Sequence, residues 1–185
     1  MPNAPTTIFE EHFNNNNRGW PEISNNNAQF AVTNNGYVIE SRTGGWWFAS
    51  KPIAINQDED FKIECSLKKI VGVDNFGYGL IWGLKNDKNY YHFVITGEGR
   101  FVISRVREGN ITDIIPWATP NSINRFNSTN KLTVEKKGDK LQFFINDSFV
   151  GKIKFEPFFG NRVGFSVWNK QTISFNDLIV TTHSK

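Results

Sequence analysis

Apolar and polar residues alternate along most of this chain, in short runs that end at Gly, Asn, Asp or Pro. The segment FKIECSL at 61–67 is the clearest case, because its odd positions are apolar and its even positions are polar. Such alternation is typical of a β-strand with one face in the protein core and the other in water. Further runs are bounded by Asn34-Asn35-Gly36, by the KGDK segment at 137–140 and by Asn146-Asp147, which predicts tight hairpins at these places.

The segment 76–107, FGYGLIWGLKNDKNYYHFVITGEGRFVISRVR, contains three aromatic-rich runs joined by KNDK and TGEG. It predicts a three-stranded antiparallel meander. With turns centred on Asn86-Asp87 and on Gly97-Glu98, pairing gives a core face with Tyr78, Leu80, Trp82, Tyr91, Phe93, Ile95, Val102, Ser104 and Val106. The opposite face then carries Gly79, Ile81, Gly83, Tyr90, His92, Val94, Phe101, Ile103, Arg105 and Arg107, and we expect it to be a shallow binding surface.

The remaining runs complete about twelve strands, with a last strand over 173–180 and no convincing helix. We therefore predict an all-β fold, a two-sheet antiparallel jelly-roll sandwich. No linker, low-complexity tail or internal repeat divides the chain, so residues 1–185 are expected to form a single domain with its first and last strands close together.

Composition agrees with this prediction and excludes some chemistry. Aromatic residues make up 15% of the 185 residues, including seventeen Phe and six Trp, which favours strands and a large core. Cys65 is the only cysteine, so it excludes an intrachain disulfide and a thiolate metal site. The net charge of +3 is too small to indicate a nucleic-acid-binding protein. No segment has the length of a membrane span. The N-terminus lacks a secretory signal pattern, which predicts a cytoplasmic protein, or an extracellular one if a leader has been removed.

Four segments together resemble a known superfamily: FEEHFNNNNRGW, YGLIWGLKNDKNYYHFVITGEGRFVISR, LTVEKKGDKLQFFINDSFV and VGFSVWNKQTISFNDLIV. They are similar to the concanavalin A-like lectin/glucanase jelly rolls, above all to bacterial domains of the laminin G-like and keto-disaccharide-hydrolase-like branches. The resemblance covers nearly the whole chain, but its motifs are structural. It implies two antiparallel sheets, one of them curved, with sugar or other polymer ligands on the concave side or at one rim.

No catalytic residue is predicted. Retaining glucanases of this superfamily place two carboxylates on one strand in an E-x-D-x-x-E pattern, because the two groups must flank one glycosidic bond, and this chain has no such match. His92 is isolated within a strand, so neither a metal site nor a Ser/His/Asp arrangement is expected. No cofactor is predicted, although oxygen-rich loops such as 14–17 leave a structural calcium ion open.

We therefore predict a non-catalytic module that binds a carbohydrate or another small or polymeric ligand. Aromatic rings can stack on the apolar face of a sugar, while Arg and His can satisfy its hydroxyl groups. Adjacent strand residues point to opposite sides, so only one of the Trp46-Trp47 pair is expected to face inward. The candidate ligand-binding residues are Trp46, Trp47, Tyr90, His92, Arg105, Arg107 and Trp117.

Three alternatives stay open. The first is a glycoside-acting enzyme that uses carboxylates such as Glu64 or Asp113, and the second is a protein-interaction or assembly domain. The third is nucleic-acid binding, which we do not expect, because the lysines it would use are interpreted as solvated hairpin positions: Lys136, Lys137, Lys140, Lys152 and Lys154.

Overall fold

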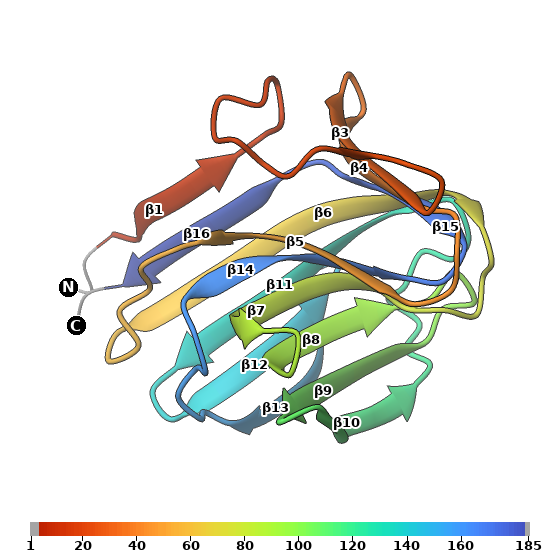
Figure 1. Cartoon of the computed structure of the whole chain (residues 1–185). Coiled ribbons are helices and arrows are strands. Elements are labelled where there is room, and N and C mark those ends of the chain that lie inside the picture. Colours follow the sequence, from red (N-terminus) through yellow and green to blue (C-terminus); the bar gives the residue numbers. More distant parts are fainter. Residues whose placement is uncertain (1–3, 184–185) are drawn as a thin grey trace.

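The computed structural model describes residues 4–183, which form two antiparallel β-sheets and contain no helix (Figure 1). No helix in this range could therefore cross a membrane. The ten-stranded sheet contains β1 (Thr6–Glu11), β2 (Ile23–Ser24), β3 (Ala28–Thr33), β4 (Gly36–Ser41), β6 (Asp60–Gly72), β11 (Thr129–Lys137), β12 (Lys140–Ile145), β13 (Ser148–Lys154), β15 (Gln171–Phe175) and β16 (Leu178–His183). The six-stranded sheet contains β5 (Trp46–Pro52), β7 (Tyr78–Asn86), β8 (Asn89–Ile95), β9 (Phe101–Arg107), β10 (Asn110–Ala118) and β14 (Arg162–Trp168). The all-β sandwich predicted from the sequence is confirmed.

The core lies between the two sheets and is built from the inward positions of alternating strands. Along β6, Phe61, Ile63, Cys65 and Leu67 are fully buried, as the alternation predicts. The sheets meet through stacked rings, because Phe165 of β14 lies 4.1 Å from Phe175 of β15 between ring centroids. Burial of these apolar side chains is the main force that holds the two layers together.

The long strand β6 pairs with both of the last two strands of the chain. It pairs with β15 along residues 67–72 and with β16 along residues 60–64, and β16 in turn pairs with β1 (Figure 1). The first and last strands are therefore neighbours, as predicted. The prediction of one continuous last strand over 173–180 is wrong, because Asn176 and Asp177 interrupt it and the Asp177 carboxylate accepts a hydrogen bond from the Ser66 N–H at 2.8 Å. This break changes the phase, so Leu178 and Val180 point into the core.

The meander over β7, β8 and β9 has the predicted strands, but one of its two registers differs from the prediction. Trp82 pairs with Tyr91, which places the apolar residues of β7 and β8 on the core face as expected. The second turn is centred on Glu98 and not between Gly97 and Glu98, so Ile95 pairs with Phe101. Gly99, with φ of +89°, and a hydrogen bond from the Thr96 N–H to the Arg100 carbonyl close this longer turn.

A shift of one residue turns every side chain of β9 to the other side of the sheet. The core face therefore contains Phe101 and Ile103, whereas Val102, Ser104 and Val106 share the outer face with Tyr90 and His92. The predicted grouping of Arg105 and Arg107 with Tyr90 and His92 is wrong for this reason.

Candidate ligand-binding site on the six-stranded sheet

Three polar side chains form a row across the outer face of the six-stranded sheet. His92 on β8 pairs with Ser104 on β9, and Ser104 pairs with Asp113 on β10. Directly paired residues on neighbouring antiparallel strands project to the same side, so the three side chains lie next to one another. The Ser104 hydroxyl donates a hydrogen bond to Asp113 Oδ1 at 2.7 Å, which leaves the exposed Asp113 carboxylate oriented above the sheet.

His92 is the most deeply buried member of the row, with 3% of its surface exposed. Burial lowers the pKa of His92 to about 4, although the nearby Asp113 carboxylate acts in the opposite direction. The imidazole is therefore neutral at physiological pH. Its Nδ1 atom is buried and has no hydrogen-bond partner among residues 4–183, although buried polar atoms in proteins are usually paired.

Three tryptophan side chains lie around this polar row. The Trp46 and Trp168 rings stack with centroids 5.0 Å apart, and the Trp46 centroid lies 5.3 Å from that of His92. Phe76 packs its edge against Trp168, and the Arg100 guanidinium lies 5.0 Å from the ring centroid of Trp117. The three tryptophan rings, the polar row and three aliphatic side chains line a hollow of about 280 Å³; the aliphatic residues are Val94, Val102 and Ile111.

The outward position of Trp46 follows from the local sequence. Trp46 and Trp47 are successive residues of β5, so their side chains leave the strand on opposite sides. Trp47 packs against Phe30 of the core at 5.9 Å between ring centroids, and Trp46 joins the outer hollow. The expectation that only one of the pair faces inward is confirmed.

The hollow brings together three of the residues predicted to bind ligand, Trp46, His92 and Trp117. Tyr90 lies on the same face but outside the hollow, because its ring is packed against Phe48 at 5.1 Å and is 3% exposed. Arg105 and Arg107 leave the other face of the sheet, where both approach the Glu156 carboxylate, at 2.7 Å and 3.5 Å.

The two glycines expected to leave gaps on this face do not do so. A Cβ atom on Gly79 would collide with the Phe93 carbonyl oxygen, and one on Gly83 would lie 3.1 Å from the Phe158 side chain. Both spaces are filled by neighbouring atoms. The hollow instead depends on the rings that surround it and on the small Ser104 side chain at its base.

Sequence reasoning missed Trp168, Ser104 and Asp113 as members of this site. The predicted register places Ser104 on the core face, and the sequence suggests Asp113 only as a carboxylate of a glycoside-acting enzyme. A signal for Asp113 exists in the sequence, because the short Glu108-Gly109 turn fixes its pairing with Ser104 once the register of β9 is known.

The structure also bears on the open alternatives. Glu64 belongs to β6 of the ten-stranded sheet, where Lys62 pairs with it at 2.9 Å, whereas Asp113 lies on the six-stranded sheet. These two carboxylates are therefore on different layers and cannot flank one bond.

Lys136 is not solvated as expected, because it is 5% exposed, donates to the Glu59 carbonyl at 3.1 Å and lies over the Phe155 ring.

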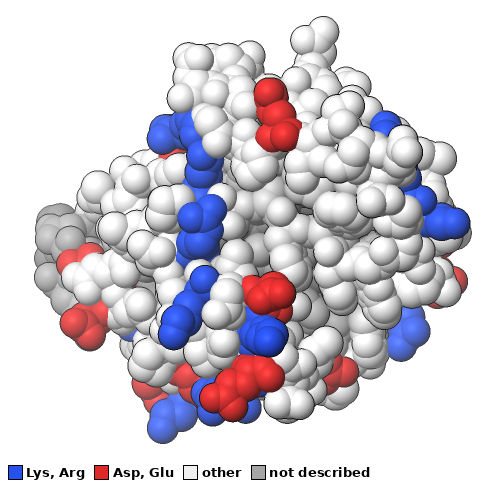
Figure 2. Space-filling model, viewed as in Figure 1, with Lys and Arg blue, Asp and Glu red and all other residues white. Residues whose placement is uncertain are grey.

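Figure 2 shows one face of the molecule with its charged residues coloured. Lys and Arg follow one side of this face and mix with Asp and Glu along its lower rim, whereas its hollowed centre is formed mainly by uncharged residues. A phosphate backbone binds best to a broad positive surface. The centre of this face does not provide one.

Comparisons with known proteins identify the fold. A carbohydrate-binding module, CBM66 from Bacillus subtilis, matches with a TM-score of 0.64 and 21% identity over 86% of this chain and 93% of the module. The carbohydrate recognition domain of Emp47p matches with a TM-score of 0.66 and 10% identity over 97% of both chains. A Bacillus subtilis protein of unknown function with a galectin-like fold matches with a TM-score of 0.67 and 11% identity over the full length of both.

No protein-family model matches the chain, and no curated protein matches its sequence. The structural likenesses confirm the concanavalin A-like jelly-roll fold that the four sequence segments predicted. Membership in the narrower laminin G-like or keto-disaccharide-hydrolase-like branch stays a prediction.

Proposed function

Since the chain has the concanavalin A-like jelly-roll fold, we propose that it is a carbohydrate-binding domain that holds a sugar in the hollow on the outer face of the six-stranded sheet. The observation that carries this proposal is the combination of tryptophan walls with a row of polar groups at one place. The structural neighbours include a carbohydrate-binding module and a carbohydrate recognition domain, which supports the class of ligand.

The chemistry of the hollow suits a sugar ring. Indole rings offer flat apolar surface to the C–H face of a pyranose. The Asp113 carboxylate can accept hydrogen bonds from hydroxyl groups, and the neutral His92 imidazole, which lines the hollow, can donate or accept one. A volume of about 280 Å³ lies just below the range of about 300–1,000 Å³ that is usual for drug-sized ligands, so the hollow fits a single sugar residue better than a longer chain.

We infer binding and not catalysis at this place. Glycoside hydrolysis requires two carboxyl groups that flank the scissile bond, about 5–5.5 Å apart in retaining enzymes and about 6.5–9.5 Å apart in inverting ones. Among the described residues that line the hollow, Asp113 is the only carboxylate. His92 has a low pKa because of burial, which makes it a poor general base at neutral pH.

A glycan array followed by calorimetric titration of the best ligand tests the proposal. We expect Trp46→Ala and Asp113→Asn each to weaken binding at least about tenfold, a loss of about 1.4 kcal/mol. Asp139→Asn, in the exposed turn between β11 and β12, is the matched control and should bind like the wild type. The proposal fails if no glycan binds, or if the control and the site variants weaken binding equally.

A further inference from the structure

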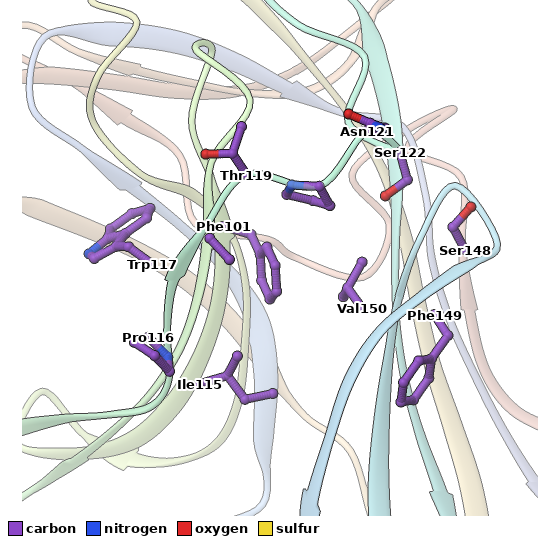
Figure 3. A pocket seen from close by; sticks show the side chains of 12 residues that line it. Phe101, Ile115, Pro116, Trp117, Thr119, Asn121, Ser122, Ser148, Phe149 and Val150 are labelled. Atoms are coloured by element: carbon purple, nitrogen blue, oxygen red, sulfur yellow. The ribbon is translucent and has the colours of Figure 1, made fainter.

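A second and larger hollow lies on the open side of the sandwich, between the two edge strands β10 and β13. These strands end their sheets, and they meet where the Ile115 side chain sits on Gly151, since a Cβ atom on Gly151 would lie 2.6 Å from Ile115 Cδ1. Beyond this contact the strands separate and leave a space of about 720 Å³ (Figure 3). This hollow shares only Trp117 with the site described above and has no part in the function proposed for that site.

The end of β10 is irregular, and this irregularity keeps the hollow open. Its pairing with β9 is irregular between Asp113 and Ile115 and again between Ile115 and Ala118, and Pro116 in this stretch has no N–H to donate. The loop that follows β10 is fixed at Ser122, because Asn146 Nδ2 donates to the Ser122 carbonyl at 2.7 Å and to Asn130 Oδ1 at 2.8 Å. Asn130 is itself fully buried. The cavity is therefore preformed.

The walls of this cavity are apolar and its rim is polar but uncharged. Figure 3 shows Phe101, Ile115 and Val150 projecting into the space, whereas the Phe149 ring lies on the other side of β13, where it packs against Phe144 at 5.8 Å between ring centroids. Phe149 is 55% exposed, which is unusual for a ring of this size. The rim carries hydroxyl and amide groups from Thr119, Asn121, Ser122 and Ser148.

The Ser122 hydroxyl is buried and has no hydrogen-bond partner among the described residues, although it lies at the wall of this cavity. An unpaired buried hydroxyl is unfavourable, so a ligand that pairs with the Ser122 hydroxyl removes this cost. Among the residues that line the cavity, none is Lys, Arg, His, Asp or Glu. A charged ligand would therefore find no counter-charge here, whereas a neutral ligand needs none.

We propose that this cavity is a second binding site, for an uncharged ring that carries hydroxyl or amide groups, such as a neutral sugar residue. Its apolar face packs on Phe101 and Val150, and its polar groups pair with Ser122 and the rim. The two sites lie on either side of β10, because the Trp117 ring points away from the cavity (Figure 3) and contributes to the outer hollow. A chain with both sites binds glycan surfaces bivalently, which raises its avidity.

Amide chemical shifts measured by NMR during titration test this proposal. The probes are methyl glycosides of glucose, galactose and mannose, and N-acetylglucosamine, with glucuronate and galacturonate as charged counterparts. We expect the neutral sugars to shift the amides of Ser122, Ser148 and Phe149, and the uronates to leave them unchanged at the same concentration. Val150→Ala and Ser122→Ala should each reduce the response at least fivefold. Phe149→Ala is the matched control and should respond like the wild type, because this ring packs on Phe144 on the other side of β13.

The outcomes separate this proposal from the function proposed above. If only the amides around His92 and Ser104 respond, the cavity proposal is overturned and the outer site stands. If only the cavity amides respond, and Trp46→Ala leaves the response unchanged, the cavity proposal stands and the outer site fails. Equal responses to neutral and charged sugars overturn the cavity proposal, as do shifts that depend on protein concentration without sugar, which would show pairing of two copies along β10 or β13.

Discussion

At the scale of single residues, His92 couples the stability of the protein to pH. Its pKa is about 4 in the folded protein and 6.5 in an unperturbed state, so the unfolded chain binds a proton in this window that the folded chain does not. The free energy of unfolding therefore falls as the pH decreases from about 6.5 to about 4, by up to about 3 kcal/mol. Above about pH 7 this contribution is fully present.

Urea denaturation at a series of pH values checks this prediction. His92→Gln should remove the pH dependence between about pH 6.5 and pH 4 that the histidine causes, whereas His12→Gln, at an exposed position, should retain it. An identical pH profile for His92→Gln and the wild type would contradict the role of His92.

Asp113 is expected to set the charge preference of the outer site. The negative carboxylate lies in the polar row and repels an acidic sugar. We therefore expect neutral glycosides to bind at least about tenfold more tightly than the matching uronic acids. Asp113→Asn removes the charge and keeps an acceptor oxygen, so it should narrow this ratio, and Asp139→Asn should not. Competition titrations measure both ratios, and an unchanged ratio in Asp113→Asn would show that another group discriminates.

At the scale of elements, the turn between β8 and β9 decides which side chains reach the outer face. Gly99 in this turn has φ of +89°, and a Cβ atom there would lie 2.8 Å from Arg125 Nε. We predict that Gly99→Ala lowers the free energy of unfolding by about 1–3 kcal/mol, because alanine is strained at this φ.

Gly44→Ala is the matched control for Gly99→Ala. A Cβ atom on Gly44 meets nothing within 4 Å, and its φ is not positive, so the change should be within about 0.5 kcal/mol. Chemical denaturation of both variants measures the difference. Equal stability of the two variants would show that the turn tolerates a side chain and that Gly99 does not determine its geometry.

At the scale of the whole molecule, the two sheets are joined on their open side by ion pairs as well as by the core. Arg105 and Arg107 of β9 approach Glu156, which follows β13 of the other sheet, and the Arg105 guanidinium is the main cause that lowers the pKa of Glu156. This stabilisation is therefore fully present above the ordinary pKa of a glutamate and is lost as the pH falls through the lower pKa of Glu156 in the folded protein.

Glu156→Gln should lower the free energy of unfolding by about 0.2–1 kcal/mol, because these groups are partly exposed and screened by solvent. The difference between variant and wild type should shrink in about 1 M salt, where screening acts within a few ångströms. Glu108→Gln, at an exposed turn position, is the control. A loss that does not depend on salt would indicate packing and not charge.

The sequence by itself determined the class of this protein and most of its core. Alternation with a period of two is a local property, so the inward face of β6 and the pairing of β7 with β8 could be predicted from the residues alone. Hairpin turns at Gly36 and at 137–140 follow from residues that accept a positive φ. The sequence also determined that one of Trp46 and Trp47 faces the core and the other the surface, because the side chains of successive strand residues project to opposite faces of the sheet.

Only the tertiary structure decided which residues form the candidate site. The strand FVISRVR is apolar in both phases, so its pattern does not say whether Phe101 and Ile103 or Val102 and Val106 face the core. A turn one residue longer selects the first arrangement, which places Ser104 beside His92 and sends Arg105 to the other side. Trp46, His92, Asp113 and Trp168 come from four strands far apart in the sequence, and sheet pairing and the packing of their rings bring them together.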